Sequence, residues 1–283
     1  MERVRAPADG EGPSLAASLE RDELRWGAGA PRAGRAALAV EVPVALEYNG
    51  VSHAVMLATP SDLEDFALGF SLSEGILATR GDFLGAEARE DPPGITLSIR
   101  IAAGAFAALK ERRRTLAGRT GCGLCGTESL QQVLRPIAPV AEPAWRLDPR
   151  ALSRALGEMR TAQGLSQATG ATHAAAWCAA DGSLLALRED VGRHNALDKL
   201  IGAMLRSRLE PAAGFACITS RASVEMVQKA ASAGIALLAA VSGPTTLAVD
   251  TAQACGLTLV GFARGESFAA YSHPGRIRGA GAA

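Results

Sequence analysis

The chain has 283 residues, 48% of them apolar, and its 29 basic residues balance its 29 acidic residues. This length is enough for one large domain or two lobes with a sizeable core. A neutral chain with 4% aromatic residues is not expected to bind nucleic acid, because such domains are usually basic and often stack bases on aromatic rings. No apolar run reaches membrane-spanning length without a charge, glycine or proline, so we expect a soluble protein without a membrane partner.

The five cysteines are an odd number, and no N-terminal segment joins a basic region to an apolar stretch and a cleavage site. We therefore expect a cytoplasmic protein with reduced thiols. Cys178, Cys217 and Cys255 lie in apolar segments, where cysteine usually behaves as a small buried hydrophobe. These three are expected to be structural.

The N-terminal half reads as a leader followed by a small α+β lobe. Residues 1–35 mix Ala, Gly, Pro, Arg and Glu without periodicity, which predicts a disordered leader. Residues 38–48 and 51–57 flank Asn49-Gly50, a type I′ turn signal, and predict a β-hairpin. The further elements expected in this lobe, which we assign to residues 36–145, are a helix starting near 59–62, a strand over 95–101 and a helix over 103–113.

Four prolines between residues 136 and 149 mark the boundary to a C-terminal lobe, assigned to residues 146–283. Asp148 is expected to cap a helix over 149–163, and an Asp181-Gly182 turn predicts a second hairpin over 173–189. Strands then alternate with helices over 183–189, 194–206, 215–219, 224–233, 235–241, 246–254 and 257–262. This rhythm predicts a largely parallel sheet covered on both faces, with a ligand crevice at the carboxyl ends of its strands.

The strongest chemical signal is the segment Gly121-Cys122-Gly123-Leu124-Cys125-Gly126, which follows a run of arginines and predicts an exposed loop. Nearby cations favour the reactive thiolate. A structural zinc site needs four ligands, and the chain has no second paired motif. A thioredoxin-like role is open, although this pair does not start a helix within the βαβ run. A site that carries sulfur as a persulfide fits the loop at least as well.

Two turns between strands and helices suggest an anionic ligand. Ser220-Arg221-Ala222-Ser223 and Ser242-Gly243-Pro244-Thr245 place hydroxyls and free N–H groups at helix N-termini, where phosphates are favoured. Plain N-capping by Ser or Thr is the commoner use of such residues. With Arg221 available for a phosphate, the two readings are about equally balanced.

Two further segments border the same crevice. In the polar stretch 189–199, Arg193, His194 and Asn195 either contact a ligand or form a network that pins the turn, and we assign His194 no acid or base role. In 261–268, at the end of the last strand, Arg264 is a candidate phosphate contact, and Phe262 or Phe268 a candidate base-stacking face.

Four segments, in this order, resemble the FdhD/NarQ family, whose members act as sulfur carriers for formate dehydrogenase. They are residues 120–126, 189–199, 220–229 and 261–271, within a similarity that covers about 36–278. The resemblance implies a cytidine deaminase-like, three-layer α/β/α C-terminal lobe beside a smaller α+β N-terminal lobe. It also implies a sulfurtransferase. A zinc deaminase is disfavoured, because the chain lacks the His-x-Glu and Pro-Cys-x-x-Cys motifs of those enzymes.

The resemblance implies a role for each matching position. Cys122 would carry the persulfide, received from a cysteine desulfurase, and Cys125 would assist. The segment Phe262, Ala263, Arg264, Gly265, Glu266 and Ser267 would bind the substrate, bis-molybdopterin guanine dinucleotide (bis-MGD), with Ser220, Arg221, Ser242 and Thr245 as additional contacts. No permanent metal is implied, and the working unit would be a homodimer.

Two alternatives remain open. A non-catalytic chaperone for bis-MGD and formate dehydrogenase would need Arg221 and Arg264 but neither cysteine of the loop. A thiol–disulfide oxidoreductase would reduce protein disulfides without any guanine nucleotide.

Overall fold

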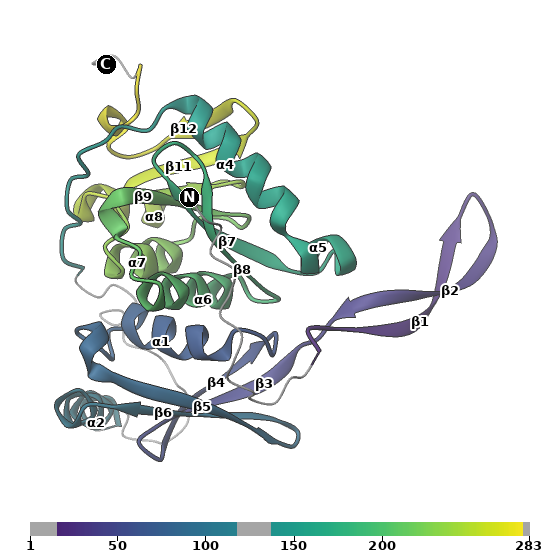
Figure 1. The fold of residues 1–283 in the computed structure, drawn as a ribbon, viewed down its shortest axis with the longest axis horizontal. Helices are drawn as coiled ribbons and strands as arrows, with labels where there is room; N and C mark the ends of the chain where they lie inside the picture. Colours follow the sequence, from purple (N-terminus) through teal and green to yellow (C-terminus); the bar gives the residue numbers. More distant parts are fainter. Residues whose placement is uncertain (1–15, 118–136, 280–283) are drawn as a thin grey trace.

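The computed structural model describes residues 16–117 and 137–279, which form an α/β structure with three separate β-sheets (Figure 1). A two-stranded ribbon projects from the body, a four-stranded sheet lies in the N-terminal part, and a six-stranded sheet forms the centre of the C-terminal part. No helix in these two ranges combines the length and apolar character needed to cross a bilayer.

The ribbon consists of β1 (Ser18–Gly27) and β2 (Gly29–Ala39), paired antiparallel. The prediction of a disordered leader is therefore wrong from Ser18 onward, while residues 1–15 lie outside the described ranges. Most side chains of both strands are exposed, so the sequence lacks the alternation of a half-buried strand. The ribbon depends on cross-strand pairs, such as Leu19 opposite Leu38 and an Arg35–Glu20 ion pair of 3.2 Å.

The four-stranded sheet has the order β4-β3-β6-β5. Its strands are β3 (Val42–Tyr48), β4 (Val51–Ala58), β5 (Phe83–Asp91) and β6 (Gly94–Ile101). Asn49 (φ 47°) and Gly50 (φ 81°) both have left-handed backbones, which confirms the predicted hairpin turn. The other elements of this part are α1 (Leu63–Ser73), the 3₁₀ turn η1 (Arg80–Asp82) and α2 (Ala103–Ala117). One face of the sheet packs on α1 through a core that includes Tyr48, Phe66 and Leu97.

The six-stranded sheet has the order β12-β11-β10-β9-β7-β8. Its strands are β7 (His173–Ala179), β8 (Leu184–Asp190), β9 (Gly214–Ile218), β10 (Leu237–Ala240), β11 (Thr258–Arg264) and β12 (Ser267–Ala270). The helices are α4 (Pro149–Ala162), α5 (Gly164–Thr169), α6 (Arg193–Arg206), α7 (Val224–Ser232) and α8 (Thr246–Cys255), with 3₁₀ turns η2 (Pro211–Ala213) and η3 (Pro274–Arg276). As predicted, the Asp148 side chain caps α4 by accepting from Arg150 N.

The prediction of a largely parallel sheet is wrong, because the sheet is mixed. Only β9, β10 and β11 are paired parallel to one another, whereas β7 is antiparallel to both β8 and β9, and β12 is antiparallel to β11. The two tight turns that join β7 to β8 and β11 to β12 enforce this reversal. Because β7 lies between β8 and β9 and is antiparallel to both, β8 runs in the same direction as β9. The carboxyl ends of β8, β9, β10 and β11 therefore share one edge of the sheet.

Helices cover both faces of this sheet. Along β7, Ala175 and Trp177 face a core built with α6, α7 and α8, while Ala176 and Cys178 face a core built with α4. Because both faces of these strands are buried, consecutive residues are apolar, which explains the continuous apolar runs in their sequences. The C-terminal part is thus a three-layer arrangement of helices, sheet and helix.

The two parts of the chain meet where α1 crosses α6 at backbone contact (Figure 1). A Cβ atom added to Gly69 on α1 would lie 1.7 Å from the Asp198 carbonyl oxygen, and one added to Gly202 on α6 would lie 1.9 Å from the Asp65 carbonyl oxygen. Real Cβ atoms never approach this closely, so only glycine allows the two helices to pack at this distance.

We predict that Gly69→Ala or Gly202→Ala destabilises the fold by about 1–3 kcal/mol or more, because the helices must separate to make room for a methyl group. Urea unfolding measures the change. Gly157→Ala is the matched control, since Gly157 lies in α4 with nothing within 4 Å of an added Cβ. That variant should gain about 0.5–1 kcal/mol from helix propensity. Equal effects of the three substitutions would contradict the close crossing.

Candidate functional site

The loops at the carboxyl ends of β9, β10 and β11 lie together, as the sequence predicts. Ala222 N donates to Gly243 O (3.3 Å), and Thr245 N donates to Ala222 O (3.1 Å). Phe262 N donates to Ser242 O (3.1 Å), which joins the end of β11 to the same loop. The N-termini of α7 and α8 begin directly after these loops, so their free N–H groups face one edge of the sheet.

Glycine brings an aromatic side chain against the second loop. A Cβ on Gly243 would lie 2.7 Å from the Phe262 ring, and a Cβ on Gly261 would lie 2.7 Å from Pro244 Cδ. Phe262 itself has a left-handed backbone (φ 54°), is 51% exposed and lies with its ring centroid 6.4 Å from that of Tyr271. An exposed ring held in an unfavourable backbone conformation offers a flat apolar face at this edge.

The hydroxyl groups of the two loops are partly committed to local hydrogen bonds. Thr245 Oγ1 accepts from Ala248 N (3.3 Å), so this residue caps α8, the commoner of the two predicted uses. Ser220 is buried and donates to Arg221 O (3.0 Å). The Arg221 side chain is exposed at the same edge, and Ser242 is half-buried. Arg221 therefore keeps an exposed side chain that a ligand can reach.

The segment Phe262–Ser267 forms the turn between β11 and β12. Arg264, Gly265, Glu266 and Ser267 are exposed, and Gly265 is left-handed (φ 54°). Ala263 is 1% exposed, and its side chain packs in the core beside α4. Ala263 can therefore meet a ligand only through its backbone. Two cationic side chains, Arg221 and Arg264, remain available on the loops of this edge.

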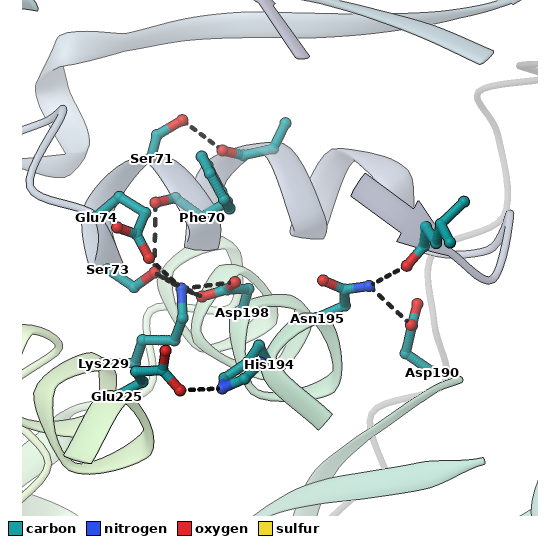
Figure 2. Close-up of polar contacts among 12 residues, drawn as sticks. Phe70, Ser71, Ser73, Glu74, Asp190, His194, Asn195, Asp198, Glu225 and Lys229 are labelled. Carbon is teal, nitrogen blue, oxygen red and sulfur yellow. Dashed lines mark hydrogen bonds and ion pairs between the residues drawn. The ribbon is translucent and has the colours of Figure 1, made fainter. Parts of the chain in front are cut away.

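His194, in the first turn of α6, pairs with Glu225, in the first turn of α7, across a 2.8 Å Nε2–Oε2 contact (Figure 2). Burial lowers the pKa of His194, Glu225 acts against this effect, and Arg193 adds to it. The imidazole is thus mainly neutral at neutral pH. The contact ties α6 to α7 beside the carboxyl edge, although the glutamate is half-exposed.

Asn195 belongs to a structural network with Asp190 and Lys199, as one of the two readings of the stretch 189–199 predicts. Asp190 and Lys199, both fully buried, form an ion pair of 2.6 Å. Asp190 also accepts from Thr59 N (3.0 Å) and from Asn195 Nδ2 (3.0 Å), and Lys199 donates to Thr59 O (2.9 Å). Asn195 donates in addition to Leu57 O (2.8 Å). These contacts hold the end of β4 against α6.

A second buried network surrounds Lys229 of α7 (Figure 2). Its ammonium group lies 2.9 Å from Asp198 Oδ2 and 2.6 Å from Glu74 Oε1, and it donates to Ser73 Oγ (3.1 Å). Burial alone would lower the pKa of Lys229, but attraction by Asp198 and Glu74 outweighs it and raises that pKa. Burial raises the pKa of Asp198, against the opposing effects of Lys229 and Ser73. One charged ammonium thus links α1, α6 and α7.

A third set of contacts, which the sequence did not reveal, centres on Asp65. This carboxylate accepts from Arg188 Nη2 (2.6 Å) and from Arg206 Nη1 (3.0 Å) and is 2% exposed. Each arginine lies more than 120 positions from Asp65 in the chain. No local sequence pattern can report contacts between residues so far apart.

Cys122 and Cys125 lie outside the described residues. The three other cysteines are buried, as expected. A hydrogen bond with Cys178, together with burial, raises the pKa of the Cys217 thiol, and burial raises that of Cys255. Thiols of this kind are poor nucleophiles at neutral pH. Within residues 16–117 and 137–279, no group of three or more His, Cys, Asp or Glu side chains is arranged to hold a metal ion.

A cavity of about 500 Å³ lies elsewhere, between α4 and the β7–β8 turn, and includes Trp145, Arg150, Asp181 and Arg278. Because β7 runs opposite to β9, this turn lies at the amino ends of β9 to β11. The cavity is therefore at the opposite end of the sheet from the three loops, and we do not assign it to the candidate site.

Comparison with known proteins agrees with the resemblance seen in the sequence. The sequence profile of the FdhD/NarQ family matches residues 39–278. The chain belongs to the FdhD/NarQ family. A protein of Variovorax paradoxus named sulfur carrier protein FdhD is 58% identical over 243 residues, which cover 86% of this chain and 87% of the relative. A protein of the same name from Cupriavidus necator is 54% identical over 255 residues, 90% of this chain and 88% of the relative.

The fold also agrees with a solved structure. A crystal structure of a protein from Desulfotalea psychrophila, described as a formate dehydrogenase accessory protein, superposes with a TM-score of 0.72. The match covers 93% of this chain and all of that one, at 24% sequence identity. At this identity the similarity establishes the α/β fold alone.

We predict that Lys229→Met destabilises the protein by about 3–5 kcal/mol, because it leaves the buried Asp198 carboxylate without its cation. Without Lys229, the pKa of Asp198 rises further above its unfolded value of 3.8. A carboxyl group whose pKa is higher in the folded than in the unfolded state stabilises the fold more as pH falls, down to the unfolded value. The deficit relative to the parent chain should therefore be larger at pH 8 than at pH 5.

Denaturant unfolding at the two pH values measures this difference. Lys110→Met, at an exposed lysine of α2, is the control and should change stability by less than about 0.5 kcal/mol. A deficit that does not depend on pH would show that Asp198 is not the group left uncompensated.

Proposed function

We propose that this chain is a sulfur carrier required for formate dehydrogenase activity, and that it acts as a sulfurtransferase in the cytoplasm. It receives persulfide sulfur from a cysteine desulfurase and passes that sulfur to bis-MGD, the molybdenum or tungsten cofactor of the dehydrogenase. The observation that carries the proposal is membership of the FdhD/NarQ family, with relatives named sulfur carrier proteins matching over most of their length. The Gly-Cys segment 121–126 supplies the nucleophile that such a function needs.

The first step is a thiol–persulfide exchange at Cys122. Its thiolate attacks the terminal sulfur of the desulfurase persulfide, the donor S–S bond breaks, and the desulfurase cysteine leaves as a thiolate. The arginines that precede the loop in the sequence favour the thiolate form of Cys122. The product is a persulfide on Cys122.

In the second step, the sulfur leaves Cys122 for the cofactor. Cys125 assists by attacking the inner sulfur of the persulfide, so that a Cys122–Cys125 disulfide forms and hydrosulfide departs. A cellular thiol then reduces the disulfide for the next cycle. Buried Cys178, Cys217 and Cys255 are unsuitable for either step, because their thiols are inaccessible.

The carboxyl edge of the six-stranded sheet is the proposed site for the guanine dinucleotide ends of the cofactor. Three properties support this placement: helix N-termini that favour phosphate, the accessible Arg221 and Arg264, and the exposed Phe262 ring against which a guanine can stack. Among the additional hydroxyls, Ser242 remains accessible, whereas Ser220 and Thr245 already have local partners.

Cys122→Ser should abolish sulfur loading. After incubation with a cysteine desulfurase and cysteine, intact-protein and peptide mass spectrometry should show an added mass of one sulfur, about 32 Da, on Cys122 of the parent chain. Cys125→Ser is the matched variant, because it lies in the same segment and should still become loaded. Loading of the Cys122→Ser variant, or normal formate dehydrogenase activity in cells that contain only this variant, would exclude the sulfur-transfer function and favour a cofactor chaperone.

Arg264→Glu should weaken the binding of guanosine diphosphate, a probe for one end of the cofactor, by about 10- to 100-fold, because it removes a charge-assisted hydrogen bond. Phe262→Ala should weaken it by a similar factor through the loss of stacking. Isothermal titration measures both. Arg150→Glu, at an exposed arginine beside the remote cavity, should leave affinity unchanged. If all three variants bind alike, the ligand lies elsewhere.

A further inference from the structure

The cavity between α4 and the β7–β8 turn takes no part in the proposed function, yet the fold holds its walls firmly in place. Its volume is about 500 Å³, within the range of known ligand sites. Gly182 in the turn has φ 85°, and a Cβ added to it would lie 2.0 Å from the Ala151 carbonyl oxygen of α4. Arg154 of α4 also pairs with Asp181 of the turn (3.2 Å). The helix and the turn are therefore fixed to each other, and the cavity is formed by the fold itself.

Trp145 forms one wall of this cavity in a fixed orientation. Its Nε1–H donates to Ala212 O (2.7 Å), and its ring centroid lies 6.1 Å from that of Phe215. The polar group of the indole is therefore already paired within the chain. The ring offers the cavity a flat apolar surface, against which the stem of a ligand side chain can pack.

The lining of the cavity carries more positive than negative charge. Its charged residues are four arginines and two aspartates: Arg146, Arg150, Arg154, Arg278, Asp148 and Asp181. Arg154 is engaged by Asp181 and by Glu158 of its own helix, and Arg278 lies 3.8 Å from Asp148. Arg146 and Arg150 are exposed and form no ion pair with any residue of 16–117 or 137–279. Within these ranges, two guanidinium groups are thus left for an external anion.

The arginines are spread along the cavity rather than gathered around one point. Arg150 and Arg154 are one turn apart on α4, about 6 Å along the helix axis. Arg278 lies beside the residue that follows Arg146, because Arg278 N donates to Leu147 O (2.9 Å). Side chains on one face of an extended peptide are about 6.8 Å apart, close to this spacing. Carboxylates at alternate positions of a peptide can therefore meet several arginines, whereas a compact ion reaches only part of the set.

We propose that this cavity docks an extended acidic segment of a partner protein, whose carboxylates pair with Arg146, Arg150 and Arg278 while the segment passes over Trp145. Arginine suits this task because its planar fork binds a carboxylate through two hydrogen bonds. The cavity lies at the amino ends of β9 to β11, opposite the loops of the candidate site. A partner docked here leaves the carboxyl edge of the sheet free, so partner and cofactor can be bound at the same time.

Fluorescence anisotropy on the full chain tests the proposal with a short labelled peptide in which glutamate alternates with serine. The parent chain should bind it at least about tenfold more tightly than the same peptide with glutamine in place of glutamate, because the charge-assisted hydrogen bonds are lost. Equal binding of the two peptides would overturn the proposal, since the cavity would then not select carboxylates.

Charge reversal at the cavity locates the contact. Arg146→Glu and Arg150→Glu should each weaken the binding of the glutamate peptide by about three- to tenfold, because an attraction becomes a repulsion. Arg160→Glu is the matched control, since Arg160 is exposed on the same helix, is not among the lining residues and gives the same change in net charge. It should bind the peptide as the parent chain does. Equal weakening by all three variants would show that only net charge matters.

Competition separates this surface from other anion sites. Guanosine diphosphate should not displace the peptide, because its proposed site is at the opposite edge of the sheet. Citrate, a compact tricarboxylate, should displace it only in large excess. Displacement by either compound at the concentration of the peptide would assign the cavity to a small anion and overturn the docking of a segment. Loss of peptide binding as the chain is concentrated would show that a second copy occupies the cavity instead.

The indole N–H of Trp145 gives a measurement on the parent chain. Its nuclear magnetic resonance signal, identified by its absence in Trp145→Phe, should shift when the glutamate peptide is added. The signal of Trp177, which is completely buried in the core, should not move. A Trp145 signal that stays in place would place the peptide elsewhere and overturn the proposal. These results do not depend on the loading of Cys122, so failure of docking and failure of sulfur transfer are separately visible.

Discussion

The backbone contact between α1 and α6 is the constraint on which the rest of the structure depends. Gly69 and Gly202 let the helices touch, with each added Cβ meeting a carbonyl oxygen of the other helix. At this distance no side chain fits between the axes, so the polar residues that flank the crossing are forced into contact. Asp65 and Asp198 are buried there, and each has cationic partners from a different element. Removal of Lys229 leaves the buried Asp198 carboxylate without its cation, whereas Asp65 keeps one arginine when the other is removed.

These buried ion pairs also connect the junction to the candidate site. Lys229 is anchored by Asp198 and Glu74, and α7, which carries it, begins at the Ser220–Ser223 loop. In the same way, α6 is fixed by Asp190 and Lys199, and it presents Arg193 and His194 at its first turn. The N-terminal part therefore sets the position of two of the helix ends that form the carboxyl edge. Buried charge here defines one arrangement of the helices rather than adding much stability, since the attraction between the ions mainly offsets their loss of hydration.

Local patterns predicted the elements well where one turn or one cap determines them. Asn49-Gly50, Asp181-Gly182 and Asp148 each lie where the sequence analysis placed them. The direction of β7 was predicted wrongly, because an alternation of strands and helices in the sequence does not show that β7 runs antiparallel to β9. The β1–β2 ribbon was missed for another reason: its exposed strands of small and charged residues lack the alternation by which strands are recognised. In β5, inward positions are held by the small residues Ala86 and Ala88, which give only a weak apolar signal. The sequence predicted that the three loops of the candidate site meet, because each loop follows the carboxyl end of a strand in the same sheet. The contacts of Asp65 and Asp198 could not be predicted in this way, because their partners are far away in the chain.

Most residues of the segment 189–199 have structural roles, so similarity to a family motif does not by itself identify the residues that take part in chemistry. Asp190, Asn195 and Lys199 bond to Leu57, Thr59 and one another, and Asp198 is held by Ser73 and Lys229. Arg193 and His194 lie in the first turn of α6, just after the end of β8, and His194 is already paired with Glu225. Loss of activity on substitution within this motif would therefore report mainly on the junction between the two parts of the chain. Chemistry at the edge is better probed at Arg221, Phe262 and Arg264, whose side chains are exposed and are not part of the buried networks.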